Sequence, residues 1–74
     1  MNLGFELTTD DIIEVASRLG KQISLDQANT LFDILDIDRA IDLALEQDTE
    51  KNQKHVAYKD LAEQFKDLGI LSVL

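Results

Sequence analysis

The chain has 74 residues, room for one small domain, and it contains no cysteine, no proline and only three glycines. The absence of cysteine excludes disulfides, thiolate metal sites and thiol catalysis, and the scarcity of helix breakers favours an all-helical chain. Fifteen acidic residues against seven basic ones give a net charge of −8, which repels nucleic acid and anionic membranes and attracts basic surfaces.

The first predicted helix covers about residues 9–19. Thr8 can cap its free N–H groups, and Leu7, in front of the cap, can pack against Ile12. Apolar side chains then recur at the three- and four-residue spacing of one helix face, and Gly20 is typical of the residue that follows a helix. The pattern therefore predicts an amphipathic helix that ends just before Gly20.

The second predicted helix covers about residues 25–35 and opens with a capping box. Ser24 stands three positions before Gln27, so the side chain of each residue can satisfy the backbone N–H group of the other. The apolar stripe continues through this segment, and the connection formed by residues 20–24 is short. We therefore expect the first two helices to be neighbours in space.

The run DILDIDRAIDLALEQD, residues 33–48, mixes six carboxylates with apolar residues. If residues 25–47 formed one helix, its apolar side chains would point to opposite sides, and a small domain cannot bury both. A break near Asp36 removes the conflict, because Asp36 then caps a third helix, at about residues 37–47, with one coherent apolar face. The run is therefore predicted to belong to two helices.

The polar segment of residues 49–55 shows no periodicity and is predicted to be a loop. The fourth helix is predicted at about residues 57–68, followed by Gly69 and by Ile70, which can make the hydrophobic contact of a Schellman ending. An apolar tail remains, made of Leu71, Val73 and Leu74. This tail either packs back on the core or offers a contact surface, and the need of a small core for apolar groups favours packing.

Residues 1–74 are thus predicted to form a single acidic all-α domain, a small bundle of four short helices arranged as two helix–loop–helix pairs. Leu3 and Phe5 are expected to cover one end of it. No apolar run approaches the roughly 18 residues of a membrane span, and the N-terminus shows no signal peptide or myristoylation pattern. We therefore expect a cytoplasmic protein that does not bind a membrane.

Calcium-binding loops of the EF-hand type need glycine at position 6 and a bidentate glutamate at position 12. A loop that starts at Asp36 has Ile41 and Gln47 at these positions, and a loop that starts at Asp48 fails at the same two positions. The segments QISLDQANTLF and HVAYKDLAEQF nevertheless resemble the second halves of EF-hands, which leaves an ion-free pairing of that kind open. No metal site and no cofactor are predicted.

The segment EVASRLG, residues 14–20, resembles the opening of a helix-turn-helix motif. The segment that would supply the recognition helix, SLDQANTLFDILD, holds three acids and no base, whereas phosphate contacts need lysine and arginine. We therefore expect no direct nucleic-acid binding. Acyl carrier proteins share the size and acidity, but Ile23 precedes Ser24 where their motif has aspartate, and a capping role explains Ser24.

No catalytic constellation is visible in the sequence. His55 is the only histidine and lies in the polar segment, where an exposed side chain without a role is the usual outcome. Paired carboxylates for acid–base catalysis need a cleft that raises the pKa of one of them, and a bundle of this size seldom has such a cleft. The protein is therefore expected not to be an enzyme.

The acidic surface is the remaining functional candidate. On the third helix Asp38, Asp42 and Glu46 are spaced i, i+4 and i+8, so they form one ridge, and like charges at this spacing oppose helix formation. Arg39 is expected to relieve this repulsion in part through Asp42. The earlier helices add further acids at Asp10, Asp11, Glu14, Asp26 and Asp33.

Two functional hypotheses follow. In the first, the protein is a non-enzymatic interaction module whose acidic helical face docks on a basic protein partner; its most specific form is a nucleic-acid-mimicking inhibitor of the phage or mobile-element type. The contact residues are then expected to be Asp38, Asp42, Glu46, Asp10, Asp11 and Glu14. In the second, the module is a structural or homodimerising domain that binds through its apolar C-terminal tail, and a monomer and a homodimer both stay open.

Overall fold

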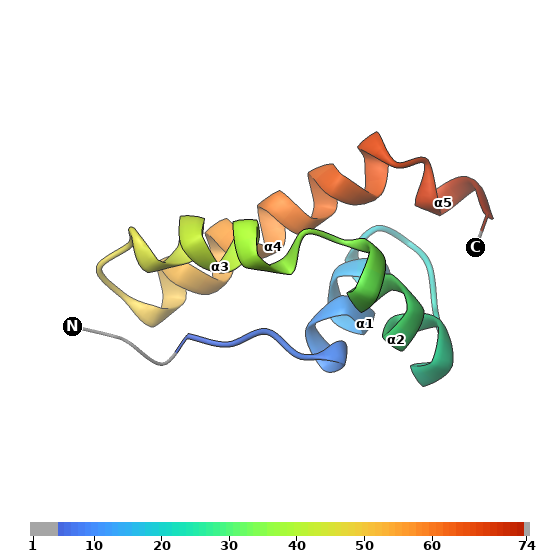
Figure 1. The fold of residues 1–74 in the computed structure, drawn as a ribbon, viewed down its shortest axis with the longest axis horizontal. Coiled ribbons are helices and arrows are strands. Elements are labelled where there is room, and N and C mark those ends of the chain that lie inside the picture. Colours follow the sequence, from blue (N-terminus) through green and yellow to red (C-terminus); the bar gives the residue numbers. More distant parts are fainter. Residues whose placement is uncertain (1–4, 74) are drawn as a thin grey trace.

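Helices account for most of the residues that the structure describes (Figure 1). The structure is a computed structural model that describes residues 5–73, without the side chains of residues 71 and 73. Its helices are α1 (Thr9–Arg18), α2 (Leu25–Ile34), α3 (Ile37–Leu45), α4 (Glu50–Asp67) and the short α5 (Ile70–Val73). No strand occurs within this described range, and the predicted all-α fold class is confirmed.

The four main helices form two pairs. α1 packs against α2, and α3 lies antiparallel along the first half of α4 (Figure 1). α4 has 18 residues, or about 27 Å at roughly 1.5 Å per residue, and it also contacts α1, which joins the two pairs. The body is elongated, with extents of 38 × 20 × 18 Å. In the described range no helix combines the length and apolar character needed to cross a membrane.

Small side chains let the helices approach one another closely. Five alanines, distributed over all four main helices, have no exposed surface: Ala16, Ala28, Ala40, Ala44 and Ala57. Phe65 and Leu61 of α4 and Ile12 of α1 are fully buried beside them. Phe5 packs against this core at one end, whereas Leu3 lies outside the described residues.

Side-chain caps confirm two of the predicted helix starts. Ser24 Oγ accepts a hydrogen bond from the Gln27 N–H at 3.1 Å, and Gln27 Oε1 accepts one from the Ser24 N–H at 2.8 Å, which completes the capping box. Asp36 Oδ1 accepts a hydrogen bond from the Arg39 N–H at 3.0 Å. Residues 33–48 are therefore divided at Asp36, as the sequence predicts.

Glycine ends α1 in the predicted way. Gly20 has a φ of +89°, and the N–H groups of Gly20 and Lys21 donate to the carbonyl oxygens of Ser17 and Ala16 at 3.0 and 2.9 Å. This pair of bonds is a Schellman motif, which needs a residue that adopts the left-handed conformation without strain. Gly69, after α4, also has a positive φ, of +65°, and a buried isoleucine follows it.

α4 begins earlier than predicted, and residues 49–55 are not a loop. Thr49 Oγ1 accepts a hydrogen bond from the Asn52 N–H at 3.2 Å, and the helix starts at the next residue. The inward position of the first turns is occupied by Gln53, which is 1% exposed and whose amide donates to the carbonyl of Gln47 at 3.4 Å. Because the buried side chain at this position is polar, the first turns of α4 show no apolar periodicity, and the sequence pattern did not predict them to be helical.

The C-terminal tail is described only in part. Its backbone forms α5, which contacts α4. The side chains of Leu71 and Val73, together with residue Leu74, lie outside the described residues. The choice between a tail packed on the core and a tail that offers a contact surface therefore stays a prediction.

Candidate functional site

The acidic ridge is defined as Asp38 and Asp42 of α3 together with Glu46, the residue that follows this helix, and all three are exposed. A spacing of four residues places the three carboxylates along one side of the helix, at intervals of about 6 Å. Within the part of the chain that the structure describes, no lysine or arginine forms an ion pair with any of them. The ridge therefore presents uncompensated negative charge to the solvent.

Arg39 pairs with Asp60 of α4, which corrects the prediction that it would relieve the ridge through Asp42. Its Nη2 and Nε atoms lie 3.0 and 3.2 Å from Asp60 Oδ1, and these hydrogen bonds raise the pKa of Arg39. Asp60 is only 7% exposed, so its carboxylate depends on a cationic partner, whereas Asp42 is solvated by water. Arg39 therefore pairs with the buried carboxylate of Asp60 and not with the exposed carboxylate of Asp42.

The Arg39–Asp60 pair belongs to a polar cluster that fixes the break between α2 and α3. Gln64, which is 5% exposed, donates from its side-chain amide to Asp60 Oδ2 at 2.8 Å. Gln64 Oε1 also accepts a hydrogen bond from the Asp36 N–H at 2.7 Å, and its amide donates to the Asp36 carbonyl at 3.0 Å. These directional bonds set the angle at which the chain turns from α2 into α3.

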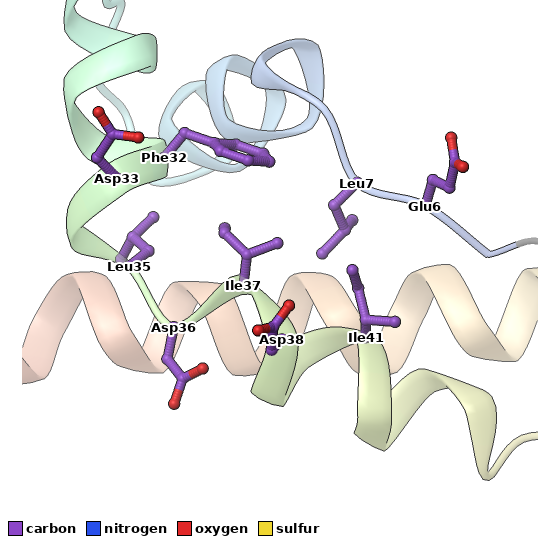
Figure 2. Close-up of a pocket in the computed structure, with 9 residues that line it drawn as sticks. All are labelled: Glu6, Leu7, Phe32, Asp33, Leu35, Asp36, Ile37, Asp38 and Ile41. Carbon is purple, nitrogen blue, oxygen red and sulfur yellow. The ribbon is translucent and has the colours of Figure 1, made fainter.

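A groove opens where the N-terminal segment, α2 and α3 meet (Figure 2). Its volume is about 490 Å³, within the range of small-molecule pockets. Its floor is apolar, made of Leu7, Phe32, Leu35, Ile37 and Ile41. Figure 2 shows Phe32, Leu7 and Ile41 approaching one another from the three elements, with Ile37 between them.

All charged residues that line this groove, among those that the structure describes, are acidic. They are Glu6, Asp33, Asp36 and Asp38, and all four are exposed. In Figure 2 the Asp36 side chain points away from the floor, in keeping with its role as the cap of α3. Asp38 belongs both to the rim and to the acidic ridge, so the groove and the ridge form one continuous surface, called here the acidic face.

The three acids of α1 that the sequence nominates as contacts have different surroundings. Asp11 is half-buried and accepts a hydrogen bond from the Tyr58 hydroxyl at 2.5 Å and another from a backbone N–H in front of α1. Glu14 forms an exposed ion pair with Arg18 at 3.4 Å. Asp10 is exposed. None of the three lines the groove, and Asp11 in particular is engaged inside the fold.

Basic residues gather on a different part of the surface. The exposed basic side chains of α4 are Lys51, Lys54, His55, Lys59 and Lys66. Arg18 and Lys54 lie over the ring of Tyr58, at 4.9 and 5.3 Å from its centroid. None of these residues lines the acid-rimmed groove. Because none of these basic side chains lies at the groove, they offset its negative potential less than a basic lining would. The rest of the surface carries both signs of charge, as in the Glu14–Arg18 pair.

A smaller hollow brings together two exposed apolar side chains, which we call the Ile34–Leu68 patch. Ile34 at the end of α2 and Leu68 after α4 are 56% and 55% exposed. They line a hollow of about 230 Å³ whose wall also includes Arg39 and Asp67, so it carries both signs of charge. Asp36 lines both this hollow and the acid-rimmed groove, so the patch adjoins the acidic face, but Ile34 and Leu68 do not line the groove.

Sequence reasoning identified the ridge but missed the groove. Glu6 precedes the first helix and was not singled out, and Asp33 was counted only as background charge. The apolar floor residues lie in segments whose apolar side chains are predicted to pack inward, and three of the five are buried. The available signal was the cap at Asp36, because a break there brings the end of one acidic helix next to the start of another.

Comparison with known protein families, with curated proteins and with solved structures finds no match to this chain. Among the described residues, no three histidines or acids are grouped so that they could hold a metal ion. A functional argument therefore has to start from the shape and charge of the protein's own surfaces.

Proposed function

We propose that the protein is a non-enzymatic binding module that docks a basic protein partner on its acidic face. The observation that carries this proposal is the charge of that face: six exposed acids, with no basic residue among the described residues that line its groove. They are Glu6, Asp33, Asp36, Asp38, Asp42 and Glu46. Such a surface steers a basic partner toward it and accelerates its association.

The cost of the ridge to the fold supports a role in binding. Like charges four residues apart destabilise a helix by a few tenths of a kcal/mol per pair. Arg39, the basic residue on the same helix, is held by Asp60 instead. Solubility alone is achieved by charges of both signs interspersed over a surface, so a ridge of one sign is better explained by a partner of the opposite sign.

The test is affinity capture of host proteins by the immobilised chain at low and at high salt, with two charge-reversed variants. Asp42→Lys changes the ridge, and Glu63→Lys makes the same charge change at an exposed position of α4. The expected partner is retained at low salt by the original protein and by Glu63→Lys, is lost with Asp42→Lys, and is released by high salt. Equal retention by both variants contradicts the proposal.

The most specific form of this proposal is a nucleic-acid-mimicking inhibitor, of the type that phages and mobile elements use. In its favour, the ridge sets carboxylates about 6 Å apart in a line, and further acids continue it along the rim of the groove. A partner of this kind binds nucleic acid through the same basic surface. A competition experiment distinguishes this form from the general one. Duplex DNA or RNA should displace the protein from a nucleic-acid-binding partner, whereas it should leave the protein bound to a basic partner of another class.

The Ile34–Leu68 patch favours a second candidate function, homodimerisation. Two exposed apolar side chains with Arg39 and Asp67 beside them can pair with a copy of themselves across a two-fold axis, apolar against apolar and positive against negative. Light scattering tests this, since the dimer should persist at high salt and be lost with Leu68→Glu. A monomer at all accessible concentrations contradicts this second function and leaves the acidic face unaffected.

A further inference from the structure

The face of α3 that borders the groove carries two parallel rows. Ile37, Ile41 and Leu45 stand four residues apart and form an apolar row, and each is followed by one member of the acidic ridge. Because successive residues of a helix are turned by about 100°, the two rows lie side by side along the helix. Both rows run for about 12 Å, which is slightly more than two helical turns.

The apolar row becomes more exposed along α3. Ile37 is 9% exposed, Ile41 is half-buried, and Leu45 is 43% exposed. The first two line the groove together with Phe32 and Leu7. The row therefore starts in the floor of the groove and continues onto the open surface of α3, so that a rod-shaped ligand can lie along it.

We infer that this surface seats a cationic amphipathic helix of the partner. The apolar side chains of such a helix, spaced i, i+4 and i+7, would enter the groove and follow the apolar row, and its flanking lysine and arginine residues would face the acidic ridge. Helices pack by fitting rows of side chains spaced four residues apart into one another, and charged rows beside an apolar seam select partners of opposite sign. This inference rests on the proposed function and names the class of segment that its acidic face recognises.

Charge complementarity decides between this occupant and others. An acidic or neutral amphipathic helix fits the apolar row equally well but meets Asp38, Asp42 and Glu46 with no compensating charge. A basic segment without apolar side chains satisfies the ridge but leaves the floor of the groove uncovered. A cationic amphipathic helix covers the apolar row with its apolar side chains and pairs its basic side chains with the acidic ridge.

Fluorescence anisotropy with labelled synthetic peptides tests the inference. The first peptide is a helix of about four turns with leucines at i, i+4, i+7 and i+11 and lysines on both flanks. The second has the same composition, with the leucines scattered around the helix. We expect the first to bind at least about ten-fold more tightly, since burying even one leucine side chain corresponds to a ten-fold difference or more.

Two exposed leucines of the protein provide matched variants. Leu45→Ser removes the open end of the apolar row, and Leu25→Ser removes a more exposed leucine, 57% exposed, at the start of α2. The first variant should weaken binding of the amphipathic peptide several-fold, and the second should leave it unchanged. Neither leucine belongs to the buried core, so both variants should stay folded.

The outcomes separate this inference from the proposed function. Equal affinity for both peptides, lost with Asp42→Lys, overturns the helix seat and leaves charge-driven docking standing. Peptide binding that depends on Leu45 but not on salt or on Asp42 overturns the role of the acids instead. If neither peptide binds at low salt, both the helix-binding inference and the proposed function are contradicted. If a peptide binds only after residues 1–4 are removed, the groove is the binding site of the protein's own N-terminus, which overturns the inference.

Discussion

The side chain of Gln64 pairs with both backbone groups of Asp36. Its Oε1 accepts a hydrogen bond from the Asp36 N–H at 2.7 Å, and its Nε2 donates to the Asp36 carbonyl oxygen at 3.0 Å. At this break the Asp36 N–H has no helical partner, and the Asp36 carbonyl oxygen accepts one helical hydrogen bond, from the Ala40 N–H at 3.4 Å, so both groups can take further partners. A glutamine 28 residues away in the sequence supplies them here, so α4 holds the junction from which the groove opens.

Replacing Gln64 should therefore destabilise the whole fold. Gln64→Ala removes both bonds to Asp36 and the bond to Asp60, and the expected loss in free energy of unfolding is about 2–3 kcal/mol. Urea denaturation followed by circular dichroism measures it. Glu63→Ala, at the exposed neighbouring position, is the control and should change the stability by less than about 0.5 kcal/mol. Similar midpoints for the two variants contradict the role assigned to Gln64.

A second prediction concerns the coupling of Arg39 to Asp60. Arg39→Ala leaves a buried carboxylate with the Gln64 amide as its remaining side-chain partner, so it should lower the urea midpoint. Asp60→Asn should lower it as well. The double variant should be less destabilised than the sum of the two single variants, because each single change already removes the pair. Additive losses would show that the two side chains act independently.

Local sequence signals predicted the helix junctions well. Ser24, Asp36 and Gly20 each act through a hydrogen bond or a backbone conformation that involves close neighbours in the sequence, so their residue types are sufficient to locate three helix ends. The partner of Arg39 was not predictable in this way. Asp60 lies 21 residues away, and its burial, which decides the competition with Asp42, is a product of the tertiary fold.

A third prediction concerns the start of α4, the helix boundary that the sequence pattern did not locate. Thr49→Ala removes the hydroxyl that accepts from the Asn52 N–H, and it should reduce stability by about 1 kcal/mol. Thr30→Ala is the matched control, because the Thr30 hydroxyl only donates to the carbonyl of Asp26 within α2. That change should be neutral or slightly stabilising, since alanine is the better helix former.

The helical content of the two threonine variants gives a second measurement. If residues 50–56 are helical because of the cap and of the buried Gln53, Thr49→Ala should fray the first turn of α4 and reduce the circular dichroism signal slightly before unfolding. If that segment were instead the loop that its polar composition suggests, Thr49→Ala and Thr30→Ala would leave the same signal.

A fourth prediction is the alkaline behaviour of Tyr58. Burial raises the pKa of Tyr58 above its ordinary value of 10.0, and the hydrogen bond to Asp11 raises it further. In the unfolded chain the phenol loses its proton near the ordinary pKa, whereas the folded protein keeps it. Stability should therefore be unaffected by this group below pH 10, and it should fall as the pH rises above that value.

Ultraviolet absorbance of the phenolate follows this titration directly, because Tyr58 is the only tyrosine in the chain. The transition should lie at higher pH in the folded protein than in concentrated urea. Asp11→Asn should shift it part of the way back, since the negative charge is removed but the burial remains. A folded-state transition at the same pH as in urea contradicts the buried position of the hydroxyl.

The acidic ridge gives the fifth prediction, in which stability and binding change in opposite directions. Asp42 has a like charge four residues away on each side, at Asp38 and at Glu46. Asp42→Ala removes both repulsions and introduces a better helix former, so it should stabilise the protein by about 0.5–1 kcal/mol at low salt. The same change should weaken binding of the cationic peptide, because it removes the middle charge of the ridge.

Salt and a control substitution identify the cause of this stabilisation. The electrostatic part of the gain from Asp42→Ala should shrink as salt screens the ridge, whereas the part from helix propensity should not. Asp33→Ala, an exposed acid near the end of α2, provides a comparison outside the ridge. If Asp42→Ala destabilises the protein at low salt, then Asp42 has a structural partner and the ridge is part of the fold. If the ridge serves binding, Asp42→Ala should be more stable than the original protein and should bind the cationic peptide less tightly.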